Sequence, residues 1–342
     1  MATTFEQPEL TGGAMPVEFQ PARLRRRIAL VLGALGALVL VALLAPGLSD
    51  VRDILAGASP GWIALGVLLE VGSCASYVLL FRPVFCSRMP WRRSAQIGLA
   101  EVATGSIVPA SGAGGLALGA WVLHRGGMPA DHIARRSVAF FLIKSSVNFV
   151  AVAVIGTVMA VGLVGPHVSL LGTALPAAAA ALLLAVVLLV PRFGPGSPPG
   201  PGTGRLRRAL SATRRSLTDG TAEAVQLVRS RDLTLLAGAF GYWAFDNVVL
   251  LATYEAVGHT PPLSIVLMGY LIGQLGGLLP LPGGVGGIDG GLIGVLVLYG
   301  APLAPTVAAV LAYRLILFWV PLVVGAPAFV TLWRRMTGRV PA

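Results

Sequence analysis

Charge is scarce in this sequence. Only 11% of the 342 residues are charged, whereas a soluble domain carries about 25% charged residues. Hydrophobic residues make up 56% of the chain, and the mean hydropathy is +0.82. Such a chain cannot cover a water-facing surface with polar side chains, so the composition excludes an ordinary soluble globular protein.

Cysteine and histidine are equally scarce. The two cysteines, Cys74 and Cys86, have no CxxC spacing and no nearby histidine, so neither a disulfide framework nor a zinc site is expected. The four histidines fall at the ends of apolar runs or in loops. We therefore expect no metal and no cofactor.

Catalytic motifs of intramembrane enzymes are also missing. The sequence has no HExxH, which a zinc protease would need. Asp246 and Asp289 could mimic an aspartyl-protease pair, but Asp289 follows Gly-Gly-Ile and does not lie in a GxGD motif. We expect that the protein is not an enzyme.

Long apolar runs, in contrast, are abundant. A helix needs roughly 20 apolar residues to cross the hydrocarbon core. Six continuous runs reach that length: Ile28–Leu48, Trp62–Phe81, Val138–Val164, Leu170–Val190, Leu233–Val257 and Val307–Trp333. The arginines before Ile28 and the apolar run that follows them resemble a signal peptide. That apolar run exceeds the usual 7–15 residues, so we expect a retained first span.

The arginines are sorted along the chain as the positive-inside rule requires. A net charge of +11 invites a nucleic-acid interpretation, but the basic residues sit in short clusters beside the apolar runs. With both termini in the cytoplasm, 22 of the 25 basic residues fall in cytoplasmic segments; the other three are Arg52 outside and Lys144 and Arg314 within spans. We predict a multi-pass protein of the cytoplasmic membrane that binds anionic lipid and no nucleic acid.

Two segments must enter and leave the membrane on the same side to keep this sorting. They are residues 95–124 and 263–299, and each contains one copy of a repeated motif. GSIVPASGAGG at Gly105–Gly115 aligns without gaps on GGLLPLPGGVG at Gly276–Gly286. Proline and glycine break a helix, and such a break survives in a membrane only inside protein or beside a watery cavity. The break residues are Pro109, Gly112, Gly114, Gly115, Pro280, Pro282, Gly283, Gly284, Gly286 and Gly287.

The repeat predicts an all-α polytopic membrane protein with two inverted halves, six full spans and two broken re-entrant hairpins. Inverted halves with discontinuous helices are typical of transporters whose site lies near the midplane. The expected order is a cytoplasmic tail (1–27), the first half (28–190), a basic cytoplasmic loop (191–232), the second half (233–333) and a second tail (334–342). A glycine- and proline-rich linker at Gly194–Gly204 divides the chain near its middle.

Six ionisable residues lie within the predicted membrane segments. They are Glu70, Glu101, Lys144, Asp246, Asp289 and Arg314. Each would cost roughly 2.5–3.5 kcal/mol unpaired at a helix centre, so they must pair, become neutral or face water. Either they form buried ion pairs that lock the halves together, or Lys144 and Arg314 attract an anionic head group while the carboxylates set cation balance or carry protons. Free N–H groups at the glycine-rich breaks would suit phosphate.

Two stretches resemble a known family. IGLAEVATGSIVPASGAGG with LHRGGMP, and GQLGGLLPLPGGVGGIDGGLIGVLVLYGAP with AYRLILFWVPLVVG, are similar to the lysylphosphatidylglycerol synthase transmembrane region, the flippase-like part of bacterial multiple-peptide-resistance factors. The resemblance extends from about Trp62 to Trp333. In this resemblance, Asp289 matches the family's acidic residue after the second glycine cluster, and Arg314 matches its arginine in the following span. Leu116 stands where the family often has an acidic residue. The resemblance also implies re-entrant helices and a phospholipid or polyprenyl-linked substrate.

The expected function is therefore translocation of a phospholipid or lipid-linked head group. The alternative is a secondary transporter of a small soluble anion, which would use the same architecture. The chain ends at Ala342 with no soluble aminoacyl-transferase domain, so we do not expect it to synthesise lysyl-lipid itself. Either a homo-oligomer or a separately encoded synthase is compatible with this expectation.

Overall fold

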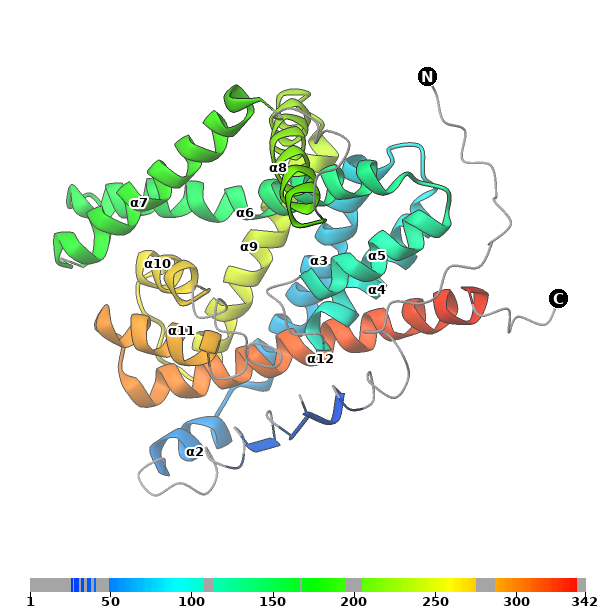
Figure 1. Cartoon of the computed structure of the whole chain (residues 1–342). Helices are drawn as coiled ribbons and strands as arrows, with labels where there is room; N and C mark the ends of the chain where they lie inside the picture. Colours follow the sequence, from blue (N-terminus) through cyan, green and yellow to red (C-terminus); the bar gives the residue numbers. More distant parts are fainter. Residues whose placement is uncertain are drawn as a thin grey trace.

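The computed structural model describes residues 49–107, 113–166, 168–194, 205–274 and 287–336, together with parts of 26–40. These residues are helical and include no strand (Figure 1). The elements are α2 (Ser49–Ala56), α3 (Pro60–Phe85), α4 (Trp91–Ile107), α5 (Ala113–Arg125), α6 (Ala130–Ala160), α7 (Leu170–Leu189), η2 (Val190–Phe193), α8 (Arg205–Arg229), α9 (Leu233–Ala256), α10 (Leu263–Gly273), α11 (Gly287–Leu298) and α12 (Leu303–Met336).

Five of the described helices are long and apolar enough to cross a membrane. They are α3, α6, α7 with its extension to Arg192, α9 and α12. Five of the six predicted spans are thereby confirmed, and most of the first one, Ile28–Leu48, lies outside the described residues. The protein is a multi-span α-helical membrane protein.

Each predicted broken hairpin contains two short helices that pack against each other. α4 and α5 form the first pair, and α10 and α11 form the second. None of the four is long enough to be counted among the spans. The segments between the arms, 108–112 and 275–286, lie outside the described residues.

The helices α3 and α9 form the central pair of the molecule and run antiparallel along their whole length. At one end, the backbone N–H of Ser59 donates to the carbonyl of Ala256 over 2.8 Å. At the other end, Gly238 of α9 lies directly against the backbone of Leu80. Because α3 and α9 occupy equivalent places in the two predicted halves, their opposite directions are what an inverted repeat requires.

One arm of each hairpin contacts the last span of the other half. The arm α4 of the first hairpin packs on α12, the last span of the second half, and α10 of the second hairpin packs on α6, the last span of the first half. Gly325 brings α12 against the backbone of Leu99 in α4, and Gly156 of α6 lies near Met268 of α10. This exchange fits two related halves; their orientation in a membrane stays a prediction.

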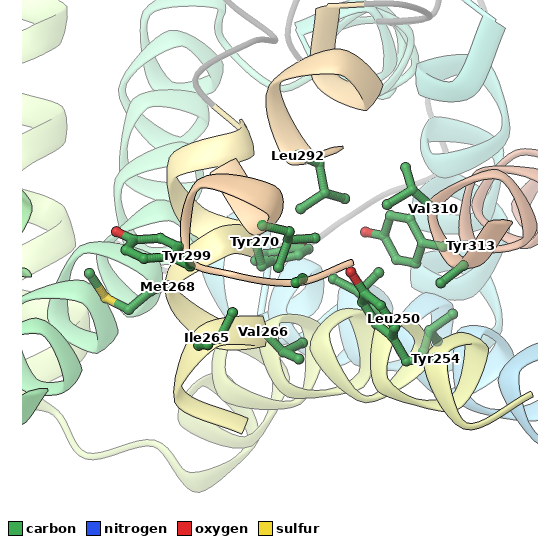
Figure 2. Close-up of a cluster of buried hydrophobic side chains, with 14 of the residues drawn as sticks. Leu250, Tyr254, Ile265, Val266, Met268, Tyr270, Leu292, Tyr299, Val310 and Tyr313 are labelled. Carbon is green, nitrogen blue, oxygen red and sulfur yellow. The ribbon is translucent and has the colours of Figure 1, made fainter. Parts of the chain in front are cut away.

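The buried side chains form two hydrophobic clusters. One lies mainly between α9, α10, α11 and α12, with contributions from α2, α6 and α7, and Figure 2 shows Leu250, Tyr254, Tyr270, Leu292 and Tyr313 within it. The other lies mainly between α3, α4, α5 and α6, with contributions from α8, α9 and α12. Each hairpin therefore packs within a different hydrophobic cluster.

Two helices occupy segments for which the sequence predicted only loops. α2 fills most of the expected outer loop between the first two spans and packs against α12. α8 fills the second part of the basic segment 191–232 and packs across α6 (Figure 1). Asp232 then caps α9 by accepting from the backbone N–H groups of Thr234 and Leu235, at 2.8 and 3.3 Å.

Candidate functional site

The ionisable residues predicted within the membrane gather near the middle of the long helices. Glu70 lies on α3, Asp246 on α9 and Lys144 on α6, each well inside its span. Glu101 comes from the hairpin arm α4, which packs against α3. The fold therefore unites four of the six predicted residues around the α3–α9 pair.

Asp246 is held by hydroxyl groups from two other helices. The Ser73 hydroxyl on α3 donates to Oδ1 over 2.8 Å, and the Tyr270 hydroxyl on α10 donates to Oδ2 over 3.0 Å. The side chain is 6% exposed. Charge-assisted hydrogen bonds of this kind hold a buried carboxylate in one orientation.

Glu101 has a similar anchor in the other half. The Tyr77 hydroxyl on α3 donates to its Oε2 over 2.8 Å. The other oxygen, Oε1, lies directly over Gly119 of α5, where no Cβ could be accommodated. Within the described part of the chain Oε1 has no hydrogen-bond partner, although the residue is only 1% exposed. A buried acceptor without a partner has lost its hydrogen bonds to water and has gained no other in exchange. Glu101 is therefore a candidate ligand-binding group.

Lys144 lies between two tyrosine rings. Its Nζ is 5.8 Å from the centre of the Tyr77 ring and 5.2 Å from that of Tyr242. Glu101 and Asp246 lie near enough to attract its charge, yet among the described residues Lys144 makes no ion pair within 4.0 Å. Cation–π contacts of this type stabilise an ammonium group by about 0.5–2 kcal/mol while leaving its donors available.

Further polar groups extend the cluster along α3, α6 and α9. Glu70 is 4% exposed and lies near enough to Asp246 for their charges to repel. Its Oε2 has no partner among the described residues, and neither do Asn148 Oδ1, Trp243 Nε1 or Asn247 Oδ1. So many buried polar atoms without partners are unusual for a structural core and indicate a place where water or a ligand binds.

The other two predicted residues form a direct ion pair. Arg314 Nε on α12 lies 3.4 Å from Asp289 Oδ1 on α11, and the two side chains are 13% and 6% exposed. The rings of Tyr270 and Tyr313 lie near each other in the same core (Figure 2), close to Asp246 and Arg314. Of the two alternatives left open by the sequence, the structure shows the ion pair for Arg314.

Several site residues carried no signal strong enough to single them out. Tyr77, Tyr242, Tyr270 and Ser73 are common residue types in membrane helices. Their helical spacing from the charges was the available clue, since Ser73 follows Glu70 by three residues and Tyr242 precedes Asp246 by four. Residues three or four apart share a helix face, so polar neighbours at that spacing could have been added to the predicted site.

Comparison with known proteins is decisive for the family. The family model of the lysylphosphatidylglycerol synthase transmembrane region matches residues 28–325. The chain belongs to this family. It is also 32% identical, over 100 residues, to a UPF0104 membrane protein of Methanothermobacter thermautotrophicus. That match covers 29% of this chain and 28% of the relative.

Membership of the transmembrane-region family confirms the resemblance seen in the sequence. The family match therefore includes both hairpins and all six ionisable residues. Most of the predicted break residues, namely Pro109, Gly112, Pro280, Pro282, Gly283, Gly284 and Gly286, lie outside the described part of the structure. Gly114 and Gly115 lie in the first turn of α5, and Gly287 begins α11.

Gly115 has a packing role that the sequence did not predict. A Cβ at this position would collide with the backbone of Glu101, so Gly115 allows α5 to approach α4 closely. Within the described residues, no group of three or more histidine, cysteine, aspartate or glutamate side chains could hold a metal ion.

Proposed function

We propose that the protein translocates a phospholipid or polyprenyl-linked head group across the cytoplasmic membrane. The observation that carries this proposal is Lys144, a cation near the middle of a membrane span that lies against Tyr77 and Tyr242 without a direct ion pair among the described residues. A phosphate group is common to both substrate classes, and an ammonium group binds it readily. The family assignment supports a lipid as substrate.

Lys144 is a better candidate for the phosphate ligand than Arg314. The ion pair with Asp289 already satisfies part of the Arg314 guanidinium. Lys144 is also the single lysine of the sequence, whereas the other basic residues are all arginines. Among the described residues no carboxylate lies within ion-pair distance of Lys144. An approaching anionic group would therefore supply a contact that the ammonium group otherwise lacks.

The charge balance of the cluster bears on the head group. Glu70, Glu101 and Asp246 contribute three carboxyl groups, whereas Lys144 contributes one ammonium group. A head group with both a phosphate and an amine would complement this arrangement, because the phosphate could bind Lys144 while the amine binds a carboxylate. An anionic head group would require some of the carboxyl groups to be protonated.

The two halves would provide alternating access in this proposal. Their inverted orientation, with both termini in the cytoplasm, would expose the cluster first through one hairpin and then through the other. Transport without a covalent step also agrees with the expectation that the chain is not an enzyme. A small soluble anion remains the alternative substrate because Lys144 could bind it equally well.

The proposal is tested with purified protein in liposomes that contain a trace of NBD-labelled phosphatidylglycerol or phosphatidylethanolamine. Dithionite destroys the NBD groups of the outer leaflet, so translocation appears as a larger quenched fraction. We expect translocation by the wild type and its loss in Lys144→Met, with Arg335→Met as a matched control because Arg335 is exposed at the end of α12. Equal quenching in protein-free vesicles, or uptake of a soluble phosphate ester instead, would overturn the lipid proposal.

A further inference from the structure

The basic helix α8 is covered by protein over only part of its length. Its second half crosses the beginning of α6, where Gly220 lies against Val138. Glu223 binds Arg135 and Arg136 of α6 at 3.5 and 3.1 Å, and Arg136 also donates to the carbonyl of Val84 at the end of α3, at 3.0 Å. α8 is thereby fixed to the ends of two membrane spans.

A single apolar stripe runs along α8 and faces α6. Leu210 and Leu217 are seven residues apart, and Thr221 and Ala224 continue the stripe four and seven residues after Leu217, spacings that keep residues on one side of a helix. Thr221 and Ala224 are buried, and Ala224 belongs to the same hydrophobic cluster as Ile133 of α6. Leu210 and Leu217, in contrast, are 62% and 49% exposed.

The direction of this stripe tells where the exposed leucines point. The buried part rests on α6, which enters the membrane at this end. Because Leu210 and Leu217 share that face, they point in the same direction beyond the edge of α6. In a bilayer that surrounds α6, these two side chains would face lipid.

The charge of the same half of α8 is entirely positive. Residues 205–215 contain five arginines and no acidic residue: Arg205, Arg207, Arg208, Arg214 and Arg215. Arg214 is exposed. An apolar stripe with a basic surround is the composition of a helix that lies in the interface of an anionic membrane, where each basic residue contributes about 1 kcal/mol of attraction.

We propose that the first half of α8 lies on the membrane surface, with Leu210 and Leu217 between head groups and acyl chains and with Arg214 and Arg215 on the phosphates of anionic lipids. A second copy of the chain is a poorer occupant, because a two-fold interface would bring the same five arginines of each copy together. The contacts of Glu223 and Arg136 then join this surface helix to α6 and α3, the helices that carry Lys144 and Glu70.

The experiment places an environment-sensitive NBD label on single cysteines of the full chain, after Cys74 and Cys86 have been replaced by serine. Labels at Leu210 and Leu217 report on the stripe, and a label at Ala212, exposed on the opposite side of the same turn, is the matched control. The protein is placed in nanodiscs of phosphatidylcholine, with or without 30% phosphatidylglycerol as a chosen composition of roughly physiological anionic charge. Lipids spin-labelled near the head group serve as quenchers.

We expect blue-shifted emission and at least twofold stronger quenching at Leu210 and Leu217 than at Ala212 in discs with phosphatidylglycerol. The difference should shrink in the double variant Arg214→Glu, Arg215→Glu. Equal quenching at all three positions in both lipids would overturn the proposal. A blue shift that persists in detergent and grows with protein concentration would assign the stripe to a second copy instead, and would equally overturn it.

Discussion

The guanidinium Nε of Arg314 lies 3.4 Å from Oδ1 of Asp289, which joins the last span to the second arm of the second hairpin. Both side chains are largely buried. Removing one member of a buried pair leaves the other charge uncompensated and typically costs about 3–5 kcal/mol.

The first prediction follows from this pair. Arg314→Gln should lower the amount of folded protein and its melting temperature, whereas the double variant Arg314→Gln, Asp289→Asn should recover most of both. Thermal unfolding in detergent, followed by tryptophan fluorescence, measures the effect. If the single variant is as stable as the wild type but inactive in lipid translocation, Arg314 is a substrate ligand and the ion pair is incidental.

The second prediction uses the single lysine. Reductive methylation with 13C-formaldehyde should label Lys144 and the N-terminus alone, which gives two resonances that Lys144→Arg separates. Adding short-chain phosphatidylethanolamine should shift the Lys144 resonance, because its phosphate would approach Nζ and replace the tyrosine rings as neighbour. Short-chain diacylglycerol, which lacks the phosphate, is the control. Identical spectra with both lipids would remove Lys144 from the proposed site.

The third prediction concerns the seat of Glu101. A methyl group at Gly119 would overlap Glu101 Oε1, so Gly119→Ala should displace the carboxyl group and destabilise the protein by about 1–3 kcal/mol, the usual range for overpacking. Gly290 of α11 has open space around it, and Gly290→Ala should leave stability unchanged or raise it by up to about 1 kcal/mol. Equal stabilities of the two variants would contradict the close packing of α4 on α5.

The fourth prediction distinguishes the contributions of the two tyrosine hydroxyl groups near Lys144 to stability. Tyr77→Phe removes the hydroxyl that donates to Glu101 and should cost about 1–3 kcal/mol, because a buried acceptor loses its partner. Tyr242→Phe keeps its ring beside Lys144 and removes no hydrogen bond that the described structure shows to Glu101 or Asp246. It should therefore be the milder change in melting temperature. A larger effect of Tyr242→Phe would mean that the Tyr77 hydroxyl contributes little.

The fifth prediction tests the orientation of the second half. With Cys74 and Cys86 replaced, a cysteine at Thr260 or Ala304 should react with an impermeant maleimide added to intact cells, whereas a cysteine at Arg335 should react only after lysis. Thr260 lies in the loop between α9 and α10, and Ala304 is the second residue of α12, directly after the loop from α11. Labelling of position 335 in intact cells would rule out a cytoplasmic C-terminus.

The sequence was sufficient to predict the class of the fold and to single out the ionisable residues that gather in the candidate site. Long apolar runs define spans because their length is fixed by the bilayer, and buried charges are conspicuous because they are so costly there. Glu70, Glu101, Lys144 and Asp246 could be found in this way before any contact was known.

The pairing of those residues could not be predicted. Whether Arg314 meets Asp289 or Asp246 depends on how α11 and α12 pack, and both carboxylates were compatible with the sequence. The helix α8 was missed for a related reason. Its arginines and small polar residues suggest a solvated loop, and its buried stripe becomes meaningful only when α6 lies beneath it.

The glycines between α3 and α9 have a mechanical consequence. Gly238 rests on the Leu80 backbone, Gly241 on Ser76, and Gly72 on the Phe245 ring. Two helices in such close contact cannot slide by part of a turn, since each glycine would then meet a Cβ. The relative position of α3 and α9 is therefore fixed, and any rocking motion must occur in the hairpins and outer helices that pack against this pair.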